Sequence, residues 1–99
     1  MTSETLIDSR TQVILVDDDP HLRQALGQTL DLAGLKVVTL ADAQGLAERI
    51  EADWPGVVVS DIRMPGIDGL QLLEQLRGGG HELPVLLITR HGEVPLAGE

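Results

Sequence analysis

Two short apolar runs that each end at acidic residues constrain the fold of this chain most strongly. Val13–Val16 is apolar throughout and is followed by three aspartates at residues 17–19. Residues 57–59 are all valine and are followed, after one serine, by Asp61. Unbroken apolar runs of this length are typical of strands that are covered on both faces, as in a parallel sheet. The sequence therefore predicts two buried strands with carboxylates directly beyond their ends.

Helical segments are expected between the strands. Asp19 and Pro20 are residue types that favour the cap and the first position of a helix, and Gly34 favours its end. The inward stripe of this helix is expected to consist of Leu22, Ala25, Leu26, Thr29, Leu30 and Ala33. Further strands are expected at residues 36–40 and 85–88, and further helices after caps at Asp42 and Asp68. Alternating strands and helices with right-handed crossovers predict an α/β fold with a parallel sheet.

Composition narrows the function classes. The formal charge is −9, so direct binding to nucleic acid is not expected, because phosphates would repel such a surface. The chain has no cysteine and therefore no disulfide or thiolate metal site. Its apolar runs are too short to cross a membrane and its N-terminus lacks the basic start of a signal peptide, so we expect a cytoplasmic protein. Residues 1–11 are expected to be a flexible leader.

The acidic residues fall into two groups. Helix capping accounts for Asp19, Asp42 and Asp68. Asp17, Asp18 and Asp61 follow strand ends, which meet at one edge of a parallel sheet and form a common site for ligand binding. Close carboxylates repel one another and attract a hard cation such as Mg²⁺. The residues alone leave a cation site and a set of turn-forming acids equally open.

A family resemblance decides between these readings. Residues 16–20, 60–69 and 86–89 closely resemble, in the right order, the motifs of the receiver domains of two-component response regulators. The resemblance covers residues 12–97, and it implies a doubly wound, flavodoxin-like sheet with strand order 2-1-3-4. It also implies that a sensor histidine kinase is the partner.

The resemblance also implies roles for individual residues. Asp61 is similar to the phosphoacceptor, and Asp17 and Asp18 are similar to the acid pair that binds Mg²⁺ together with it. The backbone carbonyl of Arg63 would complete the metal ligands. Thr89 is similar to the hydroxyl residue that bonds the phosphoryl group, although a β-branched residue also suits a strand. The protein would then be a signalling module and no enzyme.

The sequence departs from the family in two places. Arg90 stands where the family has a small residue beside the phosphorylation pocket. The chain ends at Glu99, so residues 12–99 are expected to be an incomplete receiver domain without the fifth strand, the last helices and the usual phosphate-contacting lysine. The strand at residues 85–88 would then have an open edge through which the chain could dimerise.

Two of the resembling segments narrow the subfamily, and two rival functions remain open. Residues 64–69 and 88–97 most resemble the receivers of enhancer-binding activators of the nitrogen-regulation class, in particular regulators of dicarboxylate transport. Nitrogen-fixation regulators of a different output class are similar to residues 88–97 as well. One rival is a remnant that no longer takes part in phosphotransfer. Another is a Mg²⁺-dependent phosphohydrolase with Asp61 as nucleophile, but such enzymes usually carry a second acid where this chain has Arg63.

Overall fold

Four parallel strands form one sheet in the computed structural model, which describes residues 6–88. The strands are β1 (Val13–Val16), β2 (Val37–Leu40), β3 (Val57–Asp61) and β4 (Val85–Ile88). Their order in the sheet is β2-β1-β3-β4, and every neighbouring pair is parallel. The sheet and its strand order confirm the prediction from the sequence. Among the described residues, β2 and β4 form the two edges.

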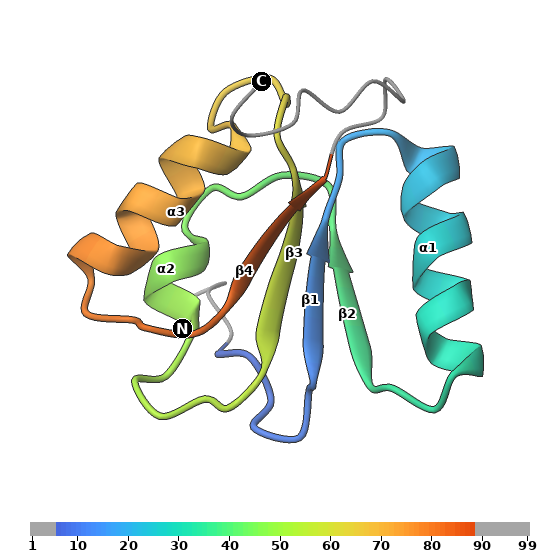
Figure 1. Ribbon diagram of the computed structural model, residues 1–99, viewed down its shortest axis with the longest axis horizontal. Helices are drawn as coiled ribbons and strands as arrows, with labels where there is room; N and C mark the ends of the chain where they lie inside the picture. Colours follow the sequence, from blue (N-terminus) through green and yellow to red (C-terminus); the bar gives the residue numbers. More distant parts are fainter. Residues whose placement is uncertain (1–5, 89–99) are drawn as a thin grey trace, which may run out of the picture.

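Helices lie on both sides of the sheet (Figure 1). The long helix α1 (Pro20–Leu32) lies on one side, and α2 (Leu46–Arg49) and α3 (Gly69–Gly78) lie on the other. Two of the expected caps are confirmed. The Asp19 carboxylate accepts hydrogen bonds from the backbone N–H groups of the first turn of α1, and the Asp68 carboxylate accepts one from Gln71. The side chain of Gln71 bonds back to the Asp68 N–H and completes a capping box.

The third expected cap, at Asp42, is wrong. The helix α2 has only four residues, begins after Gly45 in the left-handed conformation and receives no side-chain cap. The Asp42 carboxylate instead accepts the N–H of Gln44 at 3.0 Å and so closes a turn that precedes the helix. Aspartate favours both arrangements, because in each its side chain bonds a backbone N–H two or three residues later.

The main core lies between the sheet and the helices α2 and α3. Ile14 and Val16 of β1 and Val58 of β3 point into it, where they meet buried side chains of the helices and of the loops beside them. These partners are Ile7, Ala43, Leu46, Ile50, Trp54, Leu72, Leu76 and Leu83. The indole N–H of Trp54 donates to the Thr11 carbonyl at 2.9 Å, so the one aromatic side chain is buried without an unmet polar group.

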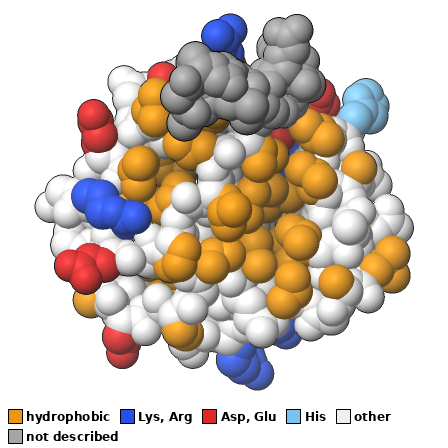
Figure 2. Space-filling model, in the orientation of Figure 1, with side chains coloured by type: hydrophobic (Ala, Val, Ile, Leu, Met, Phe, Trp, Pro, Cys, Tyr) orange, Lys and Arg blue, Asp and Glu red, His pale blue; other side chains and the backbone are white. Residues whose placement is uncertain are grey.

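The opposite face of the sheet is covered less completely. No residue of α1 is buried, and only Leu22, Leu26 and Leu30 of its expected inward stripe are half-buried. Ala25, Thr29 and Ala33 are exposed, so the stripe is narrower than predicted. At the edge of the sheet, Leu86 of β4 is 54% exposed. Figure 2 shows hydrophobic side chains gathered across the middle of the side on which β4 lies.

Part of the expected leader packs against the domain. Ile7 is buried in the main core and its N–H donates to the Arg49 carbonyl at 2.8 Å. Thr11 is buried as well, whereas residues 1–5 lie outside the described part of the chain. Within residues 6–88, no helix has the length and apolar character needed to span a membrane.

Candidate functional site

Asp17, Asp18 and Asp61 meet at one edge of the sheet. One carboxylate oxygen from each can be chosen so that all three lie within 4.8 Å of one another. Asp17 and Asp61 are buried, and Asp18 is half-buried. The neighbouring strands β1 and β3 end side by side and bring these residues together, as the parallel topology predicts.

The β1–α1 loop holds its two acids through local hydrogen bonds. The Asp17 N–H donates to Leu40 of β2 at 3.1 Å, which extends the sheet one residue beyond β1. Asp17 Oδ1 accepts the N–H of Asp19 at 2.9 Å, and the Asp17 carbonyl accepts a bond from Arg23 Nη1 at 2.7 Å. The loop is thus tied to the sheet on one side and to α1 on the other.

The β3–α3 loop positions Asp61. Its Oδ1 accepts the N–H of Arg63 at 3.2 Å, and its carbonyl accepts the hydroxyl of Ser60 at 2.9 Å. Gly69, the first residue of α3, lies directly against this carbonyl, because a Cβ at Gly69 would be 2.6 Å from the Asp61 oxygen. Gly66 has a φ of +76°, which a glycine adopts without strain. The loop motif therefore sets the backbone around Asp61.

The donor set suits a hard divalent cation. All three side chains offer oxygen, which Mg²⁺ and Ca²⁺ prefer, and a cation between them would offset the repulsion of three close carboxylates. Opposite ligands of Mg²⁺ are about 4.2 Å apart, at metal–oxygen distances of about 2.1 Å. Three ligands of an octahedral ion include at most one opposite pair, and neighbouring ligands are about 3.0 Å apart. Carboxylate oxygens within 4.8 Å of one another are close enough for one or two direct bonds, and Mg²⁺ usually keeps waters at its other positions. The residues therefore fit Mg²⁺.

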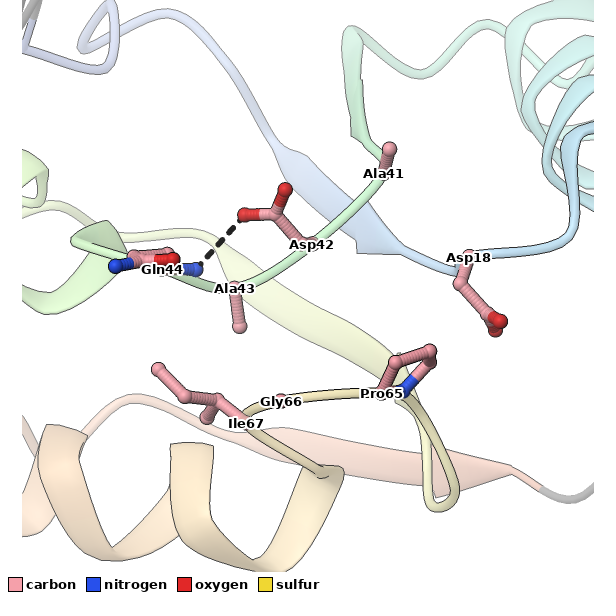
Figure 3. A pocket seen from close by; sticks show the side chains of 8 residues that line it. All are labelled: Asp18, Ala41, Asp42, Ala43, Gln44, Pro65, Gly66 and Ile67. Atoms are coloured by element: carbon pink, nitrogen blue, oxygen red, sulfur yellow. Dashed lines mark hydrogen bonds between the residues drawn. The ribbon is translucent and has the colours of Figure 1, made fainter.

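A cavity of about 620 Å³ adjoins the acidic cluster. Figure 3 shows Asp18 at one end of it, beside Pro65, and shows Ala43 and Ile67 pointing toward each other across it. The loops after β2 and β3 form its walls, so the approach to Asp18 is lined by both acidic and apolar groups. Small groups can therefore reach this end of the sheet from the side of α2.

Not every residue that the sequence singled out can be placed, and one residue of the site was missed. Thr89 and Arg90 lie outside the described residues. Arg63 is described, and its N–H contacts Asp61 while its side chain is exposed. Arg23 was not predicted as part of the site, although it bonds the backbone of Asp17. The sequence signal that could have pointed to Arg23 was a positively charged residue in the first turn of a predicted helix, where acidic residues are favoured.

The sequence and the fold match known proteins. Residues 13–99 match the family model described as response regulator receiver domain. Over 90 residues the chain is 70% identical to the C4-dicarboxylate transport transcriptional regulatory protein DctD of Pseudomonas aeruginosa, a match that covers 91% of this chain and 20% of that protein. DctD of Rhizobium meliloti is 47% identical over 85 residues, with coverages of 86% and 18%. The chain thus spans about a fifth of the length of these relatives.

A solved structure gives the same result for the fold. The crystal structure of FixJ-N superposes with a TM-score of 0.73 at 32% sequence identity. The superposition covers 91% of this chain and 70% of that one. The sheet order and the arrangement of helices are therefore shared with a solved structure.

Proposed function

The chain belongs to the family of response regulator receiver domains, and on this premise we propose that it accepts a phosphoryl group on Asp61 from a sensor histidine kinase. The observation that carries the proposal is the meeting of three carboxylates at the ends of β1 and β3, with Asp61 only 1% exposed. A buried carboxylate beside two other acids suits a nucleophile whose surroundings exclude competing reactions.

In the proposed step, the phosphoryl group moves from a nitrogen of the donor to an oxygen of Asp61. An Asp61 carboxylate oxygen attacks the phosphorus of a phosphohistidine, an oxygen–phosphorus bond forms, and the phosphorus–nitrogen bond of the donor breaks. The donor imidazole leaves with the electron pair and takes up a proton. The product is an acyl phosphate on Asp61. The backbone N–H of Arg63 holds the Asp61 carboxylate for this attack, and the Ser60 hydroxyl holds the main-chain carbonyl of Asp61.

We assign the cation to Asp17, Asp18 and Asp61, with the backbone carbonyl of Arg63 as a further ligand. When bound, Mg²⁺ would supply positive charge beside the oxygens of the phosphoryl group in transfer. Asp17 is already held by its bonds to Asp19 and Leu40, so it is oriented before a cation arrives. Thr89 is proposed to donate a hydrogen bond to the phosphoryl group.

Two further proposals concern partners. The 70% identity to a regulator named for C4-dicarboxylate transport supports a role in controlling transcription of that transport. We also propose that a second copy of the chain pairs with the outer edge of β4. That strand has the sequence Val-Leu-Leu-Ile, with no charged residue to oppose pairing, and Leu86 is exposed on it.

The phosphoacceptor is tested by incubating the chain with phosphoramidate and MgCl₂ and measuring the intact mass. We expect one added phosphoryl group, which is released by hydroxylamine as acyl phosphates are. Asp61→Asn should abolish the addition, because the amide lacks the nucleophilic oxygen charge. Asp31→Asn is the matched control, because Asp31 is exposed on α1 and lies outside both the cluster and the adjoining cavity.

Two outcomes would contradict the assignment. A phosphoryl group that persists in Asp61→Asn would place the acceptor elsewhere. A parent chain that stays unmodified, while a second receiver domain with known acceptor activity is labelled in the same tube, would favour the remnant that takes no part in phosphotransfer.

A further inference from the structure

The positively charged side chain of Arg23 lies at the start of α1, where the helix dipole disfavours a positive charge. Arg23 is the fourth residue of α1, next to the partial positive charge of the helix N-terminus. Acidic residues are favoured there, yet the first turn of α1 contains none. The helix dipole alone therefore disfavours a positive charge at Arg23, and the contacts of its side chain with other segments decide its role.

That contact is with the backbone of the acidic loop. Side chains of a helix incline toward its N-terminus, so Arg23 reaches back over the first turn of α1 toward the end of β1. Its Nη1 donates to the main-chain carbonyl of Asp17 at 2.7 Å, a short distance that is typical of a bond from a charged donor. The Arg23 side chain is half-buried, so water competes only partly for this bond.

The bond closes the loop on which two of the three acids stand. The Asp17 N–H is fixed by Leu40, and the Asp17 carbonyl on its other side is fixed by Arg23. The peptide unit between Asp17 and Asp18 is therefore oriented by the guanidinium. This peptide unit is the backbone from which the Asp18 side chain extends into the cluster with Asp61.

We propose that Arg23 is a positioning residue for the acidic cation site. It holds the backbone of the β1–α1 loop so that the carboxylates of Asp17 and Asp18 meet that of Asp61 before a cation binds. The inference rests on the cation site proposed above. It adds a residue from the N-terminal end of α1 that acts through the main chain of Asp17 and offers no ligand to the cation.

The charge of Arg23 has the opposite effect on cation affinity. A guanidinium near the cluster repels a divalent ion, so removal of the charge alone would tighten binding. Salt separates the two effects, because the Debye length is about 10 Å at 0.1 M and roughly 3 Å at 1 M ionic strength. The hydrogen bond to the Asp17 carbonyl is much less sensitive to salt than the long-range repulsion.

The test is Mg²⁺ titration calorimetry on the full chain in low and high KCl, with Arg23→Met and Arg23→Gln. Both variants lose the charge; Met has no donor for the Asp17 carbonyl, and Gln has only a shorter, neutral one. Either variant carries the test if the other fails to fold. In high salt we expect the Mg²⁺ dissociation constant to rise about three- to tenfold, the effect of losing one hydrogen bond of average strength. Arg23→Lys, which keeps a charged donor, should restore most of the affinity.

Arg10→Met is the matched control, because it removes the same charge from an exposed side chain that pairs with Asp8 before β1. Its dissociation constant in high salt should equal that of the parent. A second measurement needs no metal: hydrogen exchange of the Asp19 amide, which bonds Asp17 Oδ1, should become faster in both Arg23 variants.

The outcomes separate this inference from the function on which it rests. Unchanged or tighter Mg²⁺ binding by Arg23→Met and Arg23→Gln in high salt would overturn the positioning role alone. A parent chain that does not bind Mg²⁺ would overturn the cation site and the positioning role with it. A loss of unfolding free energy without a change in Mg²⁺ affinity would show a purely structural role and would also overturn the inference.

Discussion

Substitution of Gly69 by alanine tests whether the backbone of α3 fixes Asp61. Gly69 begins the helix directly behind the acceptor loop, and its N–H donates to the Ile62 carbonyl at 2.9 Å. An added Cβ would lie 2.6 Å from the Asp61 carbonyl oxygen and 2.9 Å from Leu87 Cδ2. The side chain of Leu87 can rotate away, but the Asp61 carbonyl is main chain and moves only with β3 or α3.

The expected change in the unfolding free energy of Gly69→Ala follows from two opposing effects. An added Cβ makes ordinary van der Waals contact only from 3.4 Å, so the helix start and the strand end must separate by about 0.8 Å from the 2.6 Å that the structure gives. Such overpacking costs about 1–3 kcal/mol of unfolding free energy. Replacement of glycine by alanine in a helix returns about 0.5–1 kcal/mol. We therefore expect Gly69→Ala to destabilise the protein by about 1–2 kcal/mol.

The same helix supplies the control. Gly78 is the last residue of α3, and a Cβ there would meet no atom within 4 Å. Gly78→Ala should therefore leave the stability unchanged or raise it by up to about 1 kcal/mol. Urea unfolding followed by the fluorescence of Trp54 measures both variants, because the indole is 5% exposed in the folded protein and is the only one in the chain.

The two alanine variants should also differ at the site. If the strain is relieved by movement of Asp61, Gly69→Ala weakens Mg²⁺ binding, whereas Gly78→Ala leaves it unchanged. Equal stability of the two variants would refute the reasoning, because α3 could then move away from Asp61 without a measurable cost.

The remaining predictions compare pairs of side chains that differ in one contact. Asp18→Ala should weaken Mg²⁺ binding roughly tenfold or more, because a charge next to the cation is lost. Asp19→Ala should change Mg²⁺ affinity less than about twofold, and the lost helix cap should lower the unfolding free energy by about 1 kcal/mol. Equal losses of Mg²⁺ affinity in calorimetry would contradict this division of roles. Asp68→Ala should lower the unfolding free energy by about 1 kcal/mol through the loss of the capping box, and Asp42→Ala by less than about 0.5 kcal/mol, as urea curves can show. Leu86→Lys should reduce the concentration-dependent self-association that sedimentation velocity measures. Leu32→Lys, at a position that is 80% exposed on α1, should leave the self-association unchanged. A parent chain that is monomeric at every concentration would exclude pairing through β4.

The strands were predictable because their signal is local. Val13–Val16 and Val85–Ile88 are apolar runs bounded by acids or proline, and the structure places strands at both. The helix after Asp42 was less predictable. Aspartate bonds its own neighbouring N–H groups in turns as readily as at helix caps, and here Gly45 in the left-handed conformation delays the start of α2. The number of residues between the aspartate and the first helical turn depends on packing beyond that segment.

The burial of α1 could not be predicted from its own sequence. Leu26 and Leu30 mark the face toward the sheet, but the width of that face depends on what else covers the same side of the sheet. In the described structure α1 is the only helix on that side, so Ala25 and Ala33 remain exposed. Periodicity gives the direction of a helix face, and the neighbours of the helix decide how much of it is buried.

The position of the acidic site could be predicted from the sequence, but the orientation of its side chains could not. Parallel strands bring the residues after them to one edge, so the meeting of Asp17 and Asp61 follows from topology alone. Topology does not orient the side chains, because a peptide unit beyond a strand can still rotate. In this chain, rotation is restricted by contacts between separate segments: Arg23 with the carbonyl of Asp17, and Gly69 with the carbonyl of Asp61. Both contacts act on the backbone, so substitutions at Arg23 and Gly69 should alter cation binding although neither side chain offers a ligand.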